Sequence, residues 1–86
     1  MEPAKYIVYI IKSEQGSYYI GQTKNIEDRL NRHNTNRSRS TKNKGKWELV
    51  IIKEFNTRSE AVKFERKLKK FNNTQRAINH IKNMNS

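Results

Sequence analysis

The chain has 86 residues and no cysteine, which fits one domain over residues 1–86 and excludes disulfide bonds and thiolate zinc sites. No apolar run reaches the roughly 20 residues of a membrane span, and the N-terminus lacks the apolar region of a secretory signal, so we expect a cytoplasmic protein without a membrane partner. The chain has 19 lysine and arginine residues and 8 acidic residues, which give a net charge of +11. Such a charge is typical of a protein that binds polyanions. The alternative is a lysine-rich surface that serves only solubility.

Two strands joined by a turn are expected at the start of the chain. Residues 6–11 form a β-branched and aromatic run of strand length, and residues 18–21 form a second one. Gly16 lies between them, at the position where a three-residue hairpin loop places a left-handed glycine. The pattern therefore predicts a β-hairpin.

The turn also predicts the register of this hairpin. If Ser13 pairs with Ser17, Tyr9 faces Gly21, and Tyr9 and Tyr19 lie on the same face of the sheet. A slip of one residue would place the two tyrosines on opposite faces. Because Gly21 has no side chain, we expect open space beside the ring of Tyr9.

A helix capped by Asn25 is expected to run to about Asn34. Its residues 26, 29, 30 and 33 fall on one face, so Arg29 and His33 lie on the stripe that should be apolar. Residues 35–46 contain no hydrophobic side chain, and we expect a mobile basic loop there. The cations expected to contact a nucleic-acid backbone are Arg37, Arg39, Lys42, Lys44 and Lys46.

The second half of the chain predicts one strand and two helices. Residues 47–55 form the strand, with residues 49–52 as its apolar centre and Trp47 as a core anchor rather than a platform for a base. A capping box at residues 57–60 opens a helix whose apolar face comprises Ala61, Phe64, Leu68 and Phe71. A shorter helix follows over about residues 74–82, and residues 83–86 are expected to be frayed. The expected fold is α+β, a small three-stranded antiparallel sheet flanked by helices in the order β-β-α-β-α-α.

Four polar side chains lie where the pattern asks for packing residues, namely Tyr9, Tyr19, Arg29 and Glu65. A site that cleaves phosphodiester bonds needs a group that activates the nucleophile, a cation for the phosphate and a carboxylate for a divalent metal. These four residues include each type of group. Spacing alone does not show that they converge.

In order and spacing, these residues and their neighbours resemble the GIY-YIG nuclease superfamily, above all its small stand-alone bacterial members. The resemblance covers roughly residues 6–81, and Ile7-Val8-Tyr9 stands where the family name has Gly-Ile-Tyr, with the tyrosine kept. The residues that carry the resemblance are Tyr9, Tyr19, Ile20, Gly21, Arg29, His33 and Glu65.

The resemblance implies a metal-dependent endonuclease, which is a hydrolase. Its catalytic residues would be Tyr9, Tyr19, Arg29, His33 and Glu65. Tyr9 would activate or orient the attacking water, and Tyr19 would assist it or position the phosphate. Arg29 would bind the scissile phosphate, and His33 would relay a proton. Glu65 would be the single protein ligand of a divalent metal, Mg²⁺ or alternatively Mn²⁺.

We expect the substrate to be DNA rather than RNA, although no residue in the sequence distinguishes between these two substrates. We also expect a monomer, with a separate targeting partner where specificity requires one.

Each residue also has a plain structural interpretation. The tyrosines and His33 are compatible with packing roles, and Arg29 with a surface ion pair to Glu27 or Asp28. Glu65 is spaced to pair with Lys69, which stabilises a helix by about 0.2–0.5 kcal/mol. For the whole protein, the alternatives are a non-catalytic nucleic-acid-binding module with the same fold and a ribosome-associated structural protein without a pocket.

Overall fold

The computed structural model describes residues 5–35 and 45–85, and the order of its elements is β-β-α-β-α-α. The elements are β1 (Tyr6–Ser13), β2 (Tyr18–Thr23), α1 (Ile26–Thr35), β3 (Trp47–Phe55), α2 (Arg58–Lys69) and α3 (Thr74–Asn85). The strands form one antiparallel sheet in the order β2-β1-β3, which confirms the expected α+β fold. None of the helices in these ranges is long and apolar enough to cross a membrane.

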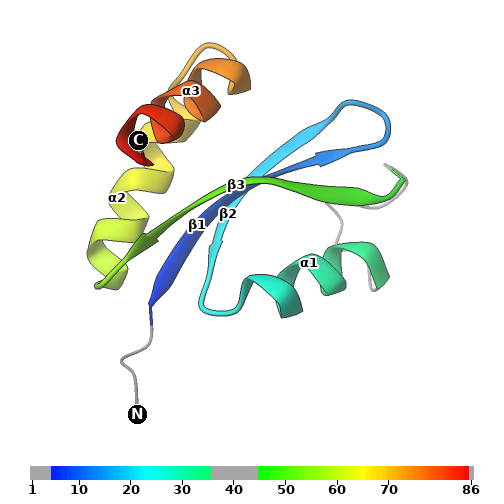
Figure 1. Ribbon diagram of the computed structural model, residues 1–86, viewed down its shortest axis with the longest axis horizontal. Helices are drawn as coiled ribbons and strands as arrows, with labels where there is room; N and C mark the ends of the chain where they lie inside the picture. The colour runs from blue at the N-terminus through cyan, green and yellow to red at the C-terminus, as the bar shows by residue number, and fades with distance from the viewer. Residues whose placement is uncertain (1–4, 36–44, 86) are drawn as a thin grey trace.

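Helices cover both faces of the sheet, with α1 on one face and α2 and α3 on the other (Figure 1). On the central strand β1, Val8 and Ile10 pack against α2 and α3, whereas Ile7, Tyr9 and Ile11 lie on the side of α1. All five are buried. Burial on both faces explains why this strand is a continuous apolar run rather than an alternating one.

The hairpin has the register that the turn predicted. Tyr9 is paired with Gly21 and Ile11 with Tyr19, and the Ser13 amide donates to the Ser17 carbonyl over 2.8 Å. Gly16 has a φ of +85°, the left-handed conformation that favours glycine at this place in the turn.

Strand β3 corrects one expectation about the core. Ile10 is paired with Ile51 and Ile11 with Leu49, so Val50 is an extra residue in a β-bulge. The bulge lies on an edge strand, and Leu49 and Val50 are 42% and 38% exposed instead of forming the apolar centre. Trp47 is 2% exposed and confirms its predicted role as a core anchor.

The helix starts follow the expected capping chemistry. The side chain of Asn25 accepts from the Asp28 amide over 3.0 Å, and that of Thr57 accepts from the Glu60 amide over 3.2 Å. These bonds satisfy amides that a helix leaves without an intrahelical partner.

The helix ends differ from expectation in two places. Phe71 lies beyond the end of α2, although it still packs against the core. Helix α3 continues through residues 83–85, where a frayed tail was expected, because this segment holds no glycine or proline that would end the helix.

One side chain ties α1 to β3. Asn34, near the end of α1, accepts from the Trp47 amide over 2.7 Å and donates to the Trp47 carbonyl over 3.1 Å. Both bonds are partly buried, so water replaces them poorly when they are lost. The pair holds the last turn of α1 against the strand that carries the largest buried aromatic residue.

We predict that Asn34→Ala lowers the free energy of unfolding by about 1–3 kcal/mol, because two backbone groups lose their partners. Urea unfolding measures the change. Asn31→Ala is the matched control, because this asparagine is exposed on the same helix, and it is expected to leave stability nearly unchanged. Equal effects of the two substitutions would contradict the tie between α1 and β3.

Candidate active site

Tyr9 fills the space that Gly21 leaves. A Cβ atom on Gly21 would lie 2.7 Å from the Tyr9 hydroxyl and 3.0 Å from Cε1 of Tyr19. The expected open space beside the ring is therefore wrong, because the ring itself lies over the glycine. This close approach lets the hydroxyl of a tyrosine on the central strand reach across to β2, the edge strand.

The Tyr9 hydroxyl is hydrogen-bonded to Nε2 of His33 over 3.0 Å. Tyr19 shares this face, with ring centroids 6.2 Å from Tyr9 and 4.9 Å from His33. Trp47 closes the cluster at 6.3 Å from His33. Tyr9 and His33 are 1% and 4% exposed, so their hydrogen bond lies in a buried aromatic setting.

Burial keeps both partners of this hydrogen bond neutral near pH 7. It raises the pKa of the Tyr9 hydroxyl far above its ordinary value, and Tyr19 adds to the rise. Burial also lowers the pKa of His33, and the positive charge of Arg29 lowers it further. Within the described residues, Nδ1 of His33 is buried without a hydrogen-bond partner, so whichever ring nitrogen carries the proton, one polar atom stays unsatisfied.

Arg29 and Glu65, which lie on two different helices, both influence the electrostatics of Tyr9. After burial and Tyr19, the positive charge of Arg29 on α1 lowers the pKa of Tyr9 and the negative charge of Glu65 on α2 raises it. The side chain of Glu65 is 18% exposed and accepts from Lys69 over 3.1 Å. The predicted Glu65–Lys69 pair is thus present, and it holds a mostly buried carboxylate.

Arg29 is exposed and lies beside the buried stripe of α1, not on it. Ile26 and Leu30 pack on the aromatic cluster, while a guanidinium keeps its contact with water. Asp28 pairs with Arg32, and among the described residues Arg29 has no ion-pair partner. The surface ion pair considered as an alternative is therefore absent from this part of the chain.

Arg29 instead lines a hollow of about 270 Å³, which we call the cationic hollow. None of the described residues that line it is acidic, and the ammonium of Lys24 lies 5.2 Å from the ring centroid of Tyr6. Lys24 and Arg58 are not among the residues predicted from the sequence, because they are far apart in the chain and meet only in the fold. The lining residues are Tyr6, Gln22, Thr23, Lys24, Arg29 and Arg58.

The predicted backbone-contacting cations fall mainly outside the described residues. Arg37, Arg39, Lys42 and Lys44 are in this group. Lys46 is described and exposed, and its carbonyl accepts from the Glu14 amide over 3.0 Å. The structure thus places Lys46 beside the hairpin turn.

The protein side chains near Tyr9 fit a hard divalent cation only if the substrate supplies further ligands. The described ranges hold no group of three or more His, Cys, Asp or Glu side chains that would bind a metal alone. Mg²⁺ commonly binds through one or two carboxylates, with waters and substrate phosphates as the other ligands. Glu65, as a single mostly buried carboxylate near Tyr9, fits that mode of binding.

The family model of the GIY-YIG catalytic domain matches residues 5–79. The chain belongs to the GIY-YIG family. GIY-YIG proteins form a superfamily of nucleases, so the protein belongs to a group that acts on nucleic acid.

The chain matches several relatives over most of their length. A UPF0213 protein of Staphylococcus saprophyticus is 40% identical over 68 residues, which cover 78% of this chain and 83% of that protein. A UPF0213 protein of Oceanobacillus iheyensis is 35% identical over 66 residues, or 76% of this chain and 77% of that protein. The solution structure of a UPF0213 protein from Bacillus halodurans is 26% identical, with a TM-score of 0.54 over 84% of this chain and 78% of that one. The GIY-YIG fold is therefore shared with small bacterial proteins.

We predict that Gly21→Ala displaces the Tyr9 ring and lowers the free energy of unfolding by about 1–3 kcal/mol, the usual range for overpacking. The chemical shifts of the His33 ring should move as its hydrogen bond is broken. Tyr9→Phe removes the atom nearest to the new methyl group, so the double variant should recover part of the loss. If the two changes were additive in thermal unfolding, Gly21 would not be positioning Tyr9.

A second prediction concerns the pKa of His33, which is expected below its ordinary value of 6.5. Arg29→Gln should raise that pKa, because it removes the cation that disfavours protonation. NMR titration of the ring measures both values, with Arg76→Gln on the opposite face of the sheet as the control. A pKa at or above 6.5, or one that Arg29→Gln leaves unchanged, would contradict this electrostatic picture.

The same shift has a consequence for stability. The unfolded chain protonates His33 more readily than the folded chain does. The contribution of neutral His33 to the free energy of unfolding is therefore complete above pH 6.5 and is lost as the pH falls through the folded pKa.

Proposed function

We propose that the protein is a metal-dependent endonuclease that hydrolyses phosphodiester bonds in nucleic acid, with DNA ahead of RNA. One observation carries the proposal, the buried hydrogen bond between Tyr9 and His33 at a point where Arg29 and Glu65 both exert their charge. Membership of a nuclease family agrees with it.

The catalytic role of Tyr9 depends on the protonation state of its hydroxyl. A hydroxyl whose pKa lies far above the ordinary value is not a phenolate near neutral pH. We infer that Tyr9 accepts a proton from the attacking water while passing its own proton to His33. The neutral imidazole of His33 is then the final proton acceptor. The water oxygen bonds to phosphorus, the phosphodiester bond to the leaving oxygen breaks, and that oxygen takes a proton from solvent.

Arg29 would bind the phosphate under attack. Three cations, Lys24, Arg29 and Arg58, line the cationic hollow, and none of them has an ion-pair partner in the described part of the chain. Three unpaired like charges in one hollow are stabilised when an anion enters it. Successive phosphates of a nucleic-acid backbone would supply such anions, with Arg29 closest to Tyr9 in its electrostatic effect.

Glu65 is the residue that would hold a divalent metal. When bound, the metal would neutralise charge on the phosphate and orient it. Lys69 holds the Glu65 carboxylate in place through its hydrogen bond. Mg²⁺ suits a single carboxylate with waters, and Mn²⁺ accepts the same oxygen ligands.

The second candidate is a nucleic-acid-binding module without catalysis. The ion pair between Glu65 and Lys69 favours it, because a carboxylate that is already neutralised needs no metal. Such a module would use the cationic hollow alone. The two candidates differ in what the loss of Glu65 does to cleavage and to binding.

We predict that Glu65→Gln abolishes Mg²⁺-dependent cleavage and leaves binding equal or slightly tighter, because one negative charge beside the phosphate has gone. Arg29→Ala should weaken binding and slow cleavage by about 10²–10³-fold, the usual loss for one charge-stabilising donor. Tyr9→Phe should slow cleavage and spare both fold and binding. Cleavage of single-stranded, duplex, nicked and branched substrates with Mg²⁺ or EDTA measures these effects.

The controls are Glu27→Gln and Arg66→Ala, two exposed residues without ion-pair partners in the described ranges. Both variants should cleave like the wild type. If the wild type cleaves nothing with Mg²⁺ or Mn²⁺ while all variants bind alike, the protein is a binding module.

A further inference from the structure

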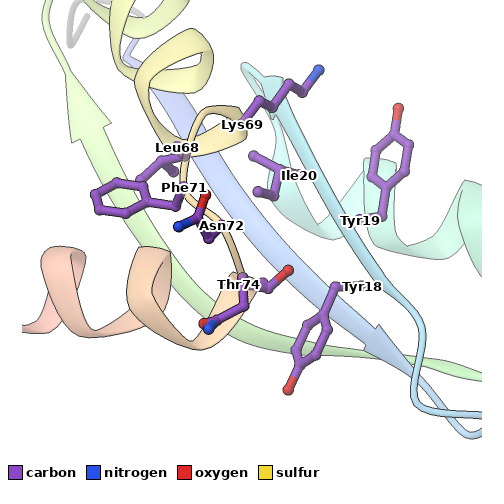
Figure 2. Close-up of a pocket in the computed structure, with 9 residues that line it drawn as sticks. Tyr18, Tyr19, Ile20, Leu68, Lys69, Phe71, Asn72 and Thr74 are labelled. Atoms are coloured by element: carbon purple, nitrogen blue, oxygen red, sulfur yellow. The ribbon is translucent and has the colours of Figure 1, made fainter.

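A second hollow, of about 320 Å³, lies between β2 and the segment that links α2 to α3, and we call it the Tyr18 hollow (Figure 2). Ile20 of β2 faces Leu68 and Phe71 across it, and Tyr18 lies beside Thr74 further along the strand (Figure 2). The hollow is therefore apolar at one end and more polar at the other. This composition is typical of sites that bind small organic rings, and its volume is at the lower end for such sites.

Tyr18 presents an exposed aromatic ring to this hollow. It is 36% exposed, one of the few large side chains that the described core does not cover. The Lys12 ammonium lies 5.5 Å from its ring centroid. An exposed ring next to a cation is suited to a ligand that combines a flat ring with a phosphate.

Asn72 supplies an unused amide at the mouth of the hollow. Its neighbour Asn73 accepts from the Arg76 amide over 2.9 Å and so caps α3. Asn72 is exposed, and its side chain has no hydrogen-bond partner within residues 5–35 and 45–85. A carboxamide has a donor and an acceptor side by side, as the edge of a nucleobase does.

The Tyr18 hollow adjoins the candidate active site. Lys69 lines it and at the same time donates to Glu65 over 3.1 Å. Tyr19 also lines it, and the Tyr19 ring lies 6.2 Å from that of Tyr9. The hollow therefore borders the candidate site through Lys69, which contacts Glu65, and through Tyr19, whose ring lies with Tyr9 on the opposite face of the sheet.

We propose that the Tyr18 hollow binds an unpaired nucleobase of the nucleic-acid strand, next to the phosphate that is cleaved. The position of that phosphate rests on the proposed function, whereas the binding of the base does not. A paired base is stacked on both faces and engaged along its edge, so only an unpaired or extruded base can enter a hollow of this kind. The protein therefore prefers single-stranded or locally unpaired nucleic acid to intact duplex.

Binding without metal tests this proposal apart from catalysis. In EDTA, fluorescence anisotropy with a short labelled DNA single strand should show that Tyr18→Ala weakens binding about tenfold, the size of one lost base–aromatic stack. Tyr18→Phe keeps the ring and should bind like the wild type. Asn79→Ala, an exposed asparagine on α3, is the control for Asn72→Ala, which should weaken binding several-fold.

A scan with abasic sites makes the test specific. Removing the base at each position of the strand in turn should weaken wild-type binding at one position, and Tyr18→Ala should no longer respond there. Deoxyadenosine monophosphate should also shift the side-chain amide signals of Asn72 in NMR spectra.

Two results would overturn the proposal. One is equal weakening of single-strand and intact-duplex binding by Tyr18→Ala, and the other is a Tyr18→Ala variant that stays as sensitive to abasic sites as the wild type. If the wild type cleaves nothing but abasic coupling is found, the nuclease proposal fails and the base site stands. If cleavage is normal in Tyr18→Ala and coupling is absent, the base site fails and the nuclease proposal stands.

Discussion

The packing of the Tyr9 ring over Gly21 is the contact on which the candidate site depends. Tyr9 lies on the central strand, buried between α1 and the rest of the sheet, where its hydroxyl would ordinarily be far from any substrate. The missing side chain at Gly21 lets the ring lean across to the edge strand. There the hydroxyl meets His33 and comes under the influence of Arg29 and Glu65. A single missing side chain thus brings a core residue to the edge of the sheet.

The aromatic cluster around this contact sets its electrostatics. Tyr19 and Trp47 flank the hydrogen bond between Tyr9 and His33, and this burial favours the neutral forms of both partners. The charged groups stay at the rim, where Arg29 is exposed and Glu65 is held by Lys69. A neutral interior with charges at its rim is suited to proton transfer next to a bound anion.

The two hollows extend the site in two directions. The cationic hollow offers Lys24 and Arg58 beside Arg29, and the Tyr18 hollow offers a ring and an amide beyond Lys69. The first suits the charged backbone of a nucleic acid and the second suits one of its bases. Both use the edge strand β2, which is paired on one side only within the described sheet.

The elements, their order and the hairpin register could be predicted from the sequence, because strand and helix periodicity, caps and a turn glycine are local signals. The order of the motif residues also predicted the family. Three features could not be predicted because they depend on packing between distant segments. They are the Tyr9 ring in the space above Gly21, the bulge beside the exposed Leu49, and the position of Arg29 beside the apolar stripe of its helix.

The same reason explains the two hollows. Arg58 and Lys24 are separated by a helix and a strand, and Tyr18 and Asn72 lie at far parts of the chain, so no spacing rule connects them. Only the tertiary structure decides which of many exposed cations and amides share a surface, because long-range packing, not local propensity, brings them together.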